Sequence, residues 1–394
     1  MNPLRHIIHL DLDAFYCAVE EQRDPALKGK AFAVGGRPDQ RGVVSSCSYA
    51  ARARGVRSAM PMRSALNLCP DLRIVSPHFT DYRTASRKVM QILRDLTPLL
   101  EQISIDEAFL DVTDLPGSIP EIACGLQAGI RQNVGLPCSL GIASNKLVAK
   151  IATDVGKMGA PKGISPNAIT IVPPGDEAEF LAPLPVTMLW GVGPKTAEKL
   201  IPLGVTTIGE LAAHPEVDLL HRFGKNGYDL ALRAKGIDNR PIVIEHEAKS
   251  ISQEVTYVQD VRDPQKLHQT LGQQSAQVAR QLQKQNLTAR TIKIKLRWSD
   301  FTTLTRQVTP GQPFDDEGTI GHHAVDLFEK EWQQAERQPV RLIGVGVSGL
   351  EKPPQQIGLW DLDWQKDEKL RQTITALRDR FGEQALQRGI GNKK

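Results

Sequence analysis

The sequence has few cysteines, no long apolar run and little net charge, and each of these absences narrows the class of protein. Its five cysteines, scattered over 394 residues, form no CxxC pair, which argues against a zinc site and against a disulfide framework. No segment approaches the roughly 20 apolar residues that span a bilayer. His9 and Asp11 break the apolar run near the N-terminus too early for a secretory signal. We therefore expect a cytoplasmic protein with reduced, mostly buried thiols and no membrane partner.

The distribution of charge is more informative than its sum. A net charge of +4 is too small to identify a nucleic-acid-binding protein. Residues 280–306, however, contain seven Lys and Arg residues and a single acid. Within them the segment 291–297, TIKIKLR, alternates apolar residues with Lys293, Lys295 and Arg297, which in a strand places the cations on one face. This face is either a solvated surface or a surface for DNA phosphates, which would relieve the repulsion between the cations.

The length and the apolar pattern predict a multidomain α+β protein. A chain of 394 residues exceeds a single hydrophobic core, so we expect two to four domains. Residues 5–13 predict a strand that runs into a helix near Ala14, and residues 78–163 alternate helices with apolar strands, as in one sheet covered by helices. Residues 166–237 are rich in Pro, Gly and short helices, and residues 240–250 predict an extended linker before a second mixture of strands and helices.

Acidic residues lie in two apolar segments, where a carboxylate is costly unless it is paired or binds a metal. In HIIHLDLDAFY, strand alternation places Asp11 and Asp13 on one face, and Asp13 directly precedes a helix, which predicts a helix N-cap. Asp11 has no such structural role. In SIDEAFLD, the neighbours Asp106 and Glu107 can serve one site only where a turn disturbs the strand. Asp11, Asp106 and Glu107 are therefore the candidate catalytic residues.

The same three acids are candidate ligands of magnesium. Hard carboxylate oxygens with no His or Cys partner nearby suit Mg²⁺ rather than zinc. Two such ions about 4 Å apart stabilise both the attacking and the leaving oxygen of an in-line phosphoryl transfer. The alternative is that these acids are only caps and surface charges, which their spacing alone does not exclude.

The acidic segments resemble those of a known family. DLDAFYCAVE near the start and SIDEAFLD about a hundred residues later are similar to motifs of the Y-family translesion DNA polymerases, the polymerase IV type in particular. SYAARARGVRSAMP resembles the fingers motif, and GIASNKLVAKIATDVGKMGAPKG resembles the end of the palm. The resemblance covers roughly residues 1–350 in order. It implies a right-hand polymerase with a ferredoxin-like palm, small fingers, a helical thumb and an α/β little-finger domain.

The resemblance also implies domain boundaries and an activity. The implied domains are a catalytic palm over 1–13 and 78–167, fingers over 14–77, a thumb with a helix-hairpin-helix over 168–237, a linker over 238–250, a DNA-binding little finger over 251–350 and a tail over 351–394. The implied enzyme is an error-prone, DNA-dependent DNA polymerase that transfers nucleotidyl groups from dNTPs to a primer 3′-hydroxyl with two Mg²⁺ ions. It would act as a monomer on primer-template DNA.

Carried over onto matching positions, the resemblance implies roles for individual residues. Asp11, Asp106 and Glu107 become metal ligands, assisted by the Leu12 carbonyl. Tyr16 matches the steric gate, an aromatic ring that excludes a 2′-hydroxyl, although the residue type alone would favour a packed core aromatic. The residues that match contacts to the incoming nucleotide are Phe15, Ser46, Tyr49, Arg52 and Lys157.

Elementary chemistry agrees with the cationic members of this set. A triphosphate with Mg²⁺ bound keeps excess negative charge, and Arg52 offers it a bidentate fork. Lys146, Lys150 and Lys157 lie at offsets of four and seven, which places them on one helical face unless Gly156 ends the helix sooner and leaves Lys157 in a loop. Without the resemblance, Arg52 would be interpreted as an exposed helix charge.

Residues 184–212 resemble a helix-hairpin-helix motif. Their sequence, LPVTMLWGVGPKTAEKLIPLGVTTIGELA, predicts two short helices joined by a turn with Gly191 and Gly193, and Lys195 follows the turn. Glycines let backbone N–H groups approach a phosphate, and the next helix N-terminus adds a favourable dipole. Such contacts ignore base sequence, as an enzyme that travels along DNA requires. The alternative is a plain turn between two helices.

A short segment of the tail resembles a protein-binding motif. Gln356, Leu359 and Trp360 lie in QIGLW, which is similar to the bacterial sliding-clamp motif, with a glutamine for hydrogen bonds and two apolar anchors. This motif predicts a sliding clamp as a partner, because tethering would raise the effective concentration of the polymerase at the primer end. The alternative is that Leu359 and Trp360 dock the tail onto the polymerase body.

Three other interpretations agree with parts of the pattern. The first is a UmuC-like polymerase subunit that acts with partners. The second, a non-catalytic DNA-binding protein with a degenerate palm, is disfavoured by the intact carboxylates and the complete fingers motif. The third, a ferredoxin-like nucleotide cyclase, would leave the helix-hairpin-helix and the basic strand unexplained. The sequence therefore predicts a translesion DNA polymerase.

Overall fold

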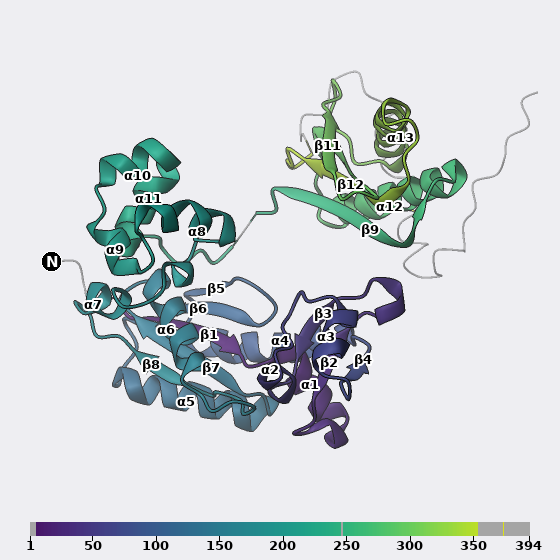
Figure 1. The fold of residues 1–394 in the computed structure, drawn as a ribbon. Helices are drawn as coiled ribbons and strands as arrows, with labels where there is room; N and C mark the ends of the chain where they lie inside the picture. The colour runs from purple at the N-terminus through teal and green to yellow at the C-terminus, as the bar shows by residue number, and fades with distance from the viewer. Residues whose placement is uncertain (1–4, 246, 354–372, 374–394) are drawn as a thin grey trace, which may run out of the picture. The chain divides into compact units, whose positions relative to one another are not determined.

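The computed structural model describes residues 5–245, 247–353 and 373 (Figure 1). The chain folds into two compact units that divide between Glu247 and Ala248. Both units combine a sheet with covering helices, which confirms the predicted α+β class. No helix in the described part of the chain is long and apolar enough to cross a membrane.

Five strands form the central sheet of the first unit, in the order β5-β6-β1-β7-β8. They are β1 (Ile7–Leu12), β5 (Leu100–Gln102), β6 (Glu107–Asp111), β7 (Cys138–Ala143) and β8 (Ile169–Ile171). The middle strand β1 pairs antiparallel with β6 and β7, and β7 pairs parallel with β8. Three long helices cover this sheet: α4 (Phe79–Leu96), α5 (Ile119–Val134) and α6 (Lys146–Met158).

The two faces of β1 belong to different cores, because successive residues of a strand point to opposite faces. Ile8 and Leu10 are fully buried in a core with residues of α4 and α5. Ile7 is buried in a second core with residues of α6. In Figure 1, α5 and α6 accordingly lie on opposite sides of the sheet. His9 and Asp11 share the face of Ile7, and both contact side chains of α6.

Helix α6 packs closely on the sheet because two glycines remove side chains from the contact. A Cβ on Gly141 of β7 would lie 2.0 Å from the Ala149 carbonyl oxygen, and a Cβ on Gly156 would lie 2.3 Å from the Thr170 hydroxyl oxygen. The helix continues through Gly156 to Met158. The suggestion that Gly156 ends it sooner is therefore wrong, since the missing side chain here serves packing rather than termination.

Residues 32–75 contain a smaller three-stranded sheet, in the order β3-β2-β4. Its elements are α1 (Phe15–Arg23), η1 (Pro25–Leu27), β2 (Phe32–Gly35), η2 (Pro38–Gln40), β3 (Val44–Cys47), α2 (Tyr49–Ala53), α3 (Met62–Leu68) and β4 (Arg73–Val75). Its own core includes Met62 and Val56, both fully buried. This sheet places α2 beside the end of β1, because Tyr49 packs against the core that contains Leu12 and Phe15.

Short helices fill residues 177–234. They are α7 (Glu177–Leu181), η3 (Val186–Met188), α8 (Pro194–Leu200), η4 (Ile201–Leu203), α9 (Ile208–Ala213), α10 (Glu216–Phe223) and α11 (Lys225–Ala234). Of the two helices predicted around the glycine turn, the second is α8, but the first is only the 3₁₀ turn η3. Three residues suffice there because Met188 and Leu189 bond back to Pro185 and Val186, so the chain reaches the glycine turn without a full helix.

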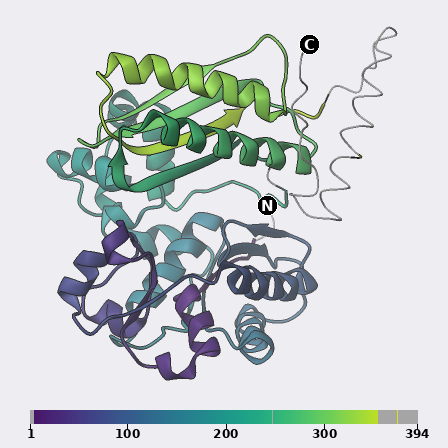
Figure 2. The same ribbon diagram turned by 90° about the vertical axis from the view of Figure 1, so that its right-hand side faces the viewer.

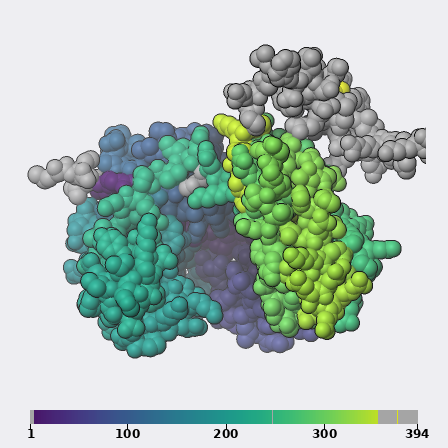
Figure 3. Space-filling model, turned by 90° about the horizontal axis from the view of Figure 1, so that it is seen from above, coloured from purple at the N-terminus to yellow at the C-terminus, as the bar shows by residue number. Residues whose placement is uncertain are grey.

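The second unit is a four-stranded sheet covered by two helices. Its elements are β9 (Ser250–Val261), α12 (Pro264–Lys284), β10 (Thr291–Trp298), β11 (Thr303–Val308), α13 (Glu317–Gln334) and β12 (Val340–Ser348), with the strand order β11-β10-β12-β9. Helices α12 and α13 run side by side over the sheet (Figure 2), and the unit forms one continuous green-to-yellow body in Figure 3. Ile292, Ile294 and Leu296 are fully buried beneath the helices, which confirms the predicted alternation of β10.

The close approach of α6 to β7 gives a test of the fold. Gly141→Ala places a methyl group against the backbone of α6, so we expect it to lower the free energy of unfolding of the first unit by about 1–3 kcal/mol through overpacking. Gly125→Ala is the matched control, because Gly125 lies in α5 with nothing within 4 Å of an added Cβ. That change should stabilise the helix by roughly 0.5–1 kcal/mol. Urea unfolding followed by circular dichroism measures both, and equal stability of the two variants would contradict the packing described.

Candidate functional site

Three acidic residues lie at one end of the central sheet. Asp11 and Glu107 are direct partners in the register of β1 and β6. Asp106 lies in the turn that joins β5 to β6, and its carbonyl accepts a hydrogen bond from the Leu12 N–H at 3.0 Å. A turn next to the strand thus brings the neighbours Asp106 and Glu107 to the same end of β1, as the pattern predicted.

Ser104 holds this turn, and sequence analysis did not identify it. Its hydroxyl donates to the Asp106 carboxylate at 2.6 Å. The same oxygen accepts from the backbone N–H groups of Asp106 and Glu107, at 3.1 and 3.0 Å. A serine two residues before an aspartate is a common turn pattern, and it was the available signal for this role.

The lysines of α6 pair with acids of the central sheet. The Lys157 ammonium contacts the Asp11 carboxylate and lies 3.4 Å from that of Asp13, and the Lys150 ammonium lies 2.8 Å from the Glu107 carboxylate. Lys146 forms a third pair, which is deeply buried, with Glu101 at 2.8 Å. The helix therefore presents its three lysines on one face, as their offsets predicted.

The surroundings of Asp11 shift the pKa of its carboxyl. Burial raises the pKa of the Asp11 carboxyl, and the nearby Glu107 and Asp106 raise it further, while Lys157 lowers it. Positive charge next to Asp11 is what favours its ionised form.

The donor set of this cluster suits a hard cation. Asp11, Asp106 and Glu107 offer only oxygen atoms, the ligands that Mg²⁺ prefers. Among the residues that the structure describes, no three His, Cys, Asp or Glu side chains are grouped closely enough to hold a metal ion. Asp11 and Glu107 are turned instead to lysine ammonium groups, which supply the positive charge that buried carboxylates require.

Asp13 does not cap α1, so the predicted N-cap role is wrong. The N-cap is Ala14, which is left-handed with a φ of 45°, and no side chain caps the helix. The Asp13 carboxylate instead accepts hydrogen bonds from the Ser139 hydroxyl at 2.9 Å and from the Asn167 N–H at 2.9 Å. The left-handed turn at Ala14 directs Asp13 back into the sheet, where it ties β1 to the segment before β8.

Tyr16 stands beside the carboxylates on α1. Its ring stacks on that of Tyr82, with centroids 4.3 Å apart and planes inclined by 15°. Phe79 meets the Tyr16 ring edge-on at 6.2 Å. Burial raises the pKa of the Tyr16 hydroxyl, and so does the nearby Asp106, which places this ring next to the acidic cluster.

The residues matched to the triphosphate also gather near this end of β1. The Arg52 guanidinium lies over the Tyr49 ring, 4.8 Å from its centroid, and donates to the Cys47 carbonyl. Ser46 accepts a hydrogen bond from the Cys17 thiol, and Phe15 is buried next to Tyr16. The Tyr49 hydroxyl is buried and has no hydrogen-bond partner among the described residues. Burial raises its pKa, as do Asp13 and Asp11, so Tyr49 stays protonated and can donate.

The glycine turn before α8 has the open geometry that its sequence predicted. Gly191 is left-handed with a φ of 105°, and a Cβ on Gly193 would meet nothing within 4 Å. The Arg233 guanidinium donates to the Trp190 carbonyl and holds one side of the turn. Lys195 lies exposed in the first turn of α8.

The basic face of β10 carries one acidic partner. Lys293, Lys295 and Arg297 lie on the face of the sheet opposite to the apolar residues of this strand. Lys295 pairs with Glu254 of β9 at 2.8 Å, across Gly344 of the intervening strand. Arg297 donates to the Thr303 hydroxyl at 2.7 Å. Sequence analysis missed Glu254, because its pairing depends on strand order rather than on sequence distance.

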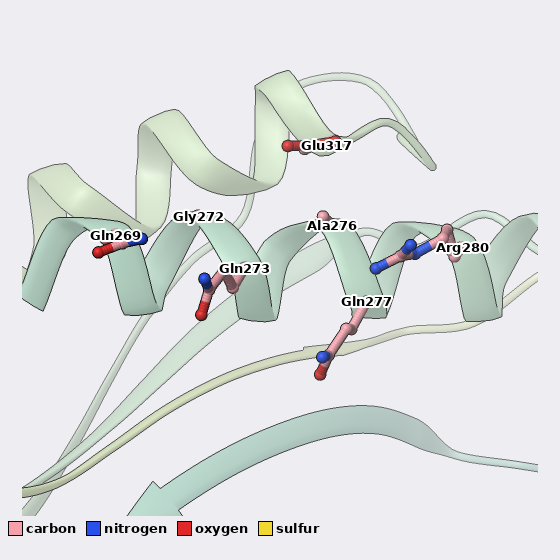
Figure 4. A pocket seen from close by; sticks show the side chains of 7 residues that line it. All are labelled: Gln269, Gly272, Gln273, Ala276, Gln277, Arg280 and Glu317. Carbon is pink, nitrogen blue, oxygen red and sulfur yellow. The ribbon is translucent and has the colours of Figure 1, made fainter. Parts of the chain in front are cut away.

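A pocket of about 470 Å³ lies on the helical side of the second unit, away from this face. Gln269, Gln273, Gln277 and Arg280 line it from α12, and Glu317 from the start of α13 (Figure 4). Its lining offers amides and one charge of each sign, a set with no nucleophile or metal-binding cluster. The residues matched to a sliding clamp, Gln356, Leu359 and Trp360, lie outside the described residues.

Models of one protein family match most of the chain. The impB/mucB/samB family model matches residues 10–154, its C-terminal domain model matches 248–359, and the helix-hairpin-helix motif model of the same family matches 174–205. The last match covers η3, the glycine turn and α8.

Curated relatives and a solved structure agree with these models. The chain is 41% identical to DNA polymerase IV of Dehalococcoides mccartyi (strain CBDB1), over 98% of this chain and 97% of the relative. It is 43% identical to DNA polymerase IV of Desulfatibacillum aliphaticivorans, over 95% and 94%, and 39% identical to DNA polymerase IV 1 of Bacillus subtilis (strain 168), over 99% and 94%. A Y-family DNA polymerase chimera superposes with a TM-score of 0.79 at 25% identity, over 88% of this chain and all of that chain. The chain belongs to the impB/mucB/samB family and is a Y-family translesion DNA polymerase of the DNA polymerase IV type.

Proposed function

We propose that nucleotidyl transfer from a dNTP to the primer 3′-hydroxyl takes place at Asp11, Asp106 and Glu107, with two Mg²⁺ ions as the cofactor. The observation that carries this proposal is that acids from two distant segments, Asp11 and the neighbours Asp106 and Glu107, lie at one end of the sheet, with Lys150 and Lys157 beside them. As a member of its family, the enzyme binds primer-template DNA and dNTPs and depends on a divalent metal.

The three carboxylates, assisted by the Leu12 carbonyl, would hold the metal ions. Two divalent ions at such a site stabilise the charge that develops on the attacking and leaving oxygens. The ion pairs with Lys157 and Lys150 support this assignment, because they show that cations bind directly to Asp11 and Glu107 at this end of the sheet. A metal ion beside Asp11 would take over the neutralising role of Lys157, and the Lys157 ammonium would then be available to a triphosphate.

The nucleotide would lie between the acids and α2. Arg52 supplies a fork of donors for the phosphates, and Ser46 adds a hydroxyl. The unpaired Tyr49 hydroxyl supports this position, because a buried donor without a partner is costly and a phosphate oxygen would satisfy it. Phe15 and Tyr16 would border the sugar, with Tyr16 as the gate against a 2′-hydroxyl.

DNA would be held by groups that ignore base sequence. Backbone N–H groups at Gly191 and Gly193, with the Lys195 ammonium, suit one phosphate backbone, and the cations of β10 suit another. We assign the palm to residues 1–13 and 78–167, the fingers to 14–77, the thumb to 168–237, the linker to 238–250 and the little finger to 251–350. The separate three-stranded sheet with its own core supports the fingers range, and the separate core of the second unit supports the little-finger range.

The enzyme would work as a monomer in the cytoplasm. Five free thiols, four of them buried, agree with a reducing compartment. The tail segment 356–360 would tether the enzyme at the primer end. We propose that this segment binds the sliding clamp.

The metal assignment predicts the behaviour of one variant. Asp106→Asn should reduce nucleotide incorporation by about 10³-fold or more, because losing a metal ligand removes several kcal/mol of charge stabilisation. DNA affinity should stay within about threefold of the unchanged enzyme, because the proposed DNA contacts lie elsewhere. Single-turnover primer extension and fluorescence anisotropy measure the two quantities. Asp114→Asn, at an exposed acid beyond β6, is the control, and extension by purified Asp106→Asn at the control rate would overturn the assignment.

The basic face of β10 predicts a change in salt dependence. Removal of Lys293, Lys295 and Arg297 together should weaken binding to all DNA sequences alike and reduce the slope of log affinity against log salt by about 0.9 for each phosphate that the protein no longer neutralises. Glu254→Gln should strengthen binding, because it frees Lys295 from its acidic partner. Lys266→Ala with Lys284→Ala and Lys330→Ala, three exposed lysines on the helical side of the unit, is the control for charge. A slope shared by the triple variant and this control would mean that β10 faces solvent.

The clamp proposal predicts a selective loss. Leu359→Ala with Trp360→Ala should abolish stimulation by the sliding clamp and leave basal extension on short templates unchanged, because only the tether is removed. Gln384→Ala, farther along the tail, is the control. If clamp stimulation persists while basal activity falls, the two residues dock the tail onto the polymerase body.

A further inference from the structure

A buried polar network lies behind the Tyr16 ring. Tyr16 stacks on Tyr82, a residue of α4 that is fully buried. The Tyr82 hydroxyl donates to the carboxylate of Glu20, which is only 3% exposed. The same carboxylate oxygen is 2.9 Å from Nδ1 of His78. Glu20 lies four residues after Tyr16 on α1, so both ends of this network start from the same helical face.

Tyr82 and Glu20, the two buried members of the network, are each held by contacts from more than one side. Tyr82 is fixed by the stack at its ring and by a charge-assisted hydrogen bond at its hydroxyl. Glu20 is fixed by Tyr82 and His78, with the Arg23 guanidinium 3.8 Å from its second oxygen. The half-exposed Phe79 meets both tyrosine rings edge-on, at 6.2 and 5.9 Å.

Stability alone does not account for this arrangement. A buried carboxylate that binds a tyrosine carries a desolvation cost, and apolar side chains of the same volume would fill the space at least as well. Unlike apolar side chains of the same volume, the polar contacts fix the position of the Tyr82 ring. Neither Glu20 nor Tyr82 belongs to the proposed metal site, and both are too buried to contact DNA.

A fixed ring is what sugar discrimination by steric exclusion requires. If the ring beside the sugar moves by a fraction of an ångström, the additional oxygen of a ribonucleotide fits. An apolar pocket without a fixed ring rejects an extra hydroxyl by only about 10²-fold. We propose that Glu20 and Tyr82 are positioning residues for the discrimination between ribo- and deoxyribonucleotides. The Glu20 carboxylate fixes the Tyr82 ring, and the Tyr82 ring fixes the Tyr16 ring against the sugar. This inference rests on the proposed role of Tyr16 as the gate.

Two conservative variants test the network. Tyr82→Phe keeps the stacked ring and removes the hydroxyl donor, and Glu20→Gln keeps the shape of the acceptor and removes its charge. Each should lower the ratio of kcat/KM for a dNTP to that for the matching rNTP by roughly three- to tenfold, the scale of one weakened hydrogen bond to a charged group. The fall should come from faster rNTP incorporation, with dNTP incorporation and thermal unfolding close to those of the unchanged enzyme.

Reference variants separate this inference from the gate assignment. Tyr16→Ala should collapse the ratio, and Tyr228→Phe, at a half-exposed tyrosine of α11, should leave it unchanged. A collapsed ratio in Tyr16→Ala with unchanged ratios in Tyr82→Phe and Glu20→Gln overturns the network and retains the gate. An unchanged ratio in Tyr16→Ala overturns both. Equal losses of dNTP and rNTP incorporation in the network variants, with lower thermal stability, would show that Glu20 and Tyr82 only support the fold.

Discussion

The pairing of the acids of the central sheet with the lysines of α6 is the interaction on which the site depends. Three lysines of one helical face meet Glu101, Glu107 and Asp11 on the face of the sheet that α6 covers. Burying one charge without a partner costs several kcal/mol. The helix and the sheet therefore fix each other's position, and Gly141 lets them approach closely enough for these contacts.

The same pairing explains how a cluster of acids persists in an apolar fold before substrate arrives. Carboxylates from adjacent strands repel one another, which adds to the effect of burial in raising the pKa of Asp11. Lys157 and Lys150 offset that repulsion and keep the side chains in place. Around this core, Ser104 shapes the acidic turn and the left-handed Ala14 brings Tyr16 back beside Asp106. The acidic cluster and Tyr16 are thus placed by two turns, one before β6 and one after β1.

Much of this arrangement could be predicted from the sequence, because periodicity determines faces. The alternation in β10, the lysine face of α6 and the turn beside Asp106 all follow from local spacing. Contacts that depend on how distant segments cross could not be predicted in this way. Asp13 satisfies its carboxylate with Ser139 and Asn167 rather than with a helix end, because the backbone turns at Ala14.

Two further contacts show the same limit. Tyr82 reaches Tyr16 only because α4 crosses α1, and Glu254 reaches Lys295 only because β12 separates their strands with a glycine. No pattern within either segment predicts these contacts. Strand order and helix crossing, which the sequence specifies only through the whole fold, decide them.

The most direct test of the account is to locate the metal. Crystals of the enzyme with primer-template, a non-reactive dNTP analogue and Mn²⁺ would give anomalous scattering at each bound ion. The account predicts two peaks about 4 Å apart, coordinated by Asp11, Asp106 and Glu107, with Lys157 moved from Asp11 to a phosphate. Peaks bound by other residues, with Lys157 still paired to Asp11, would contradict it.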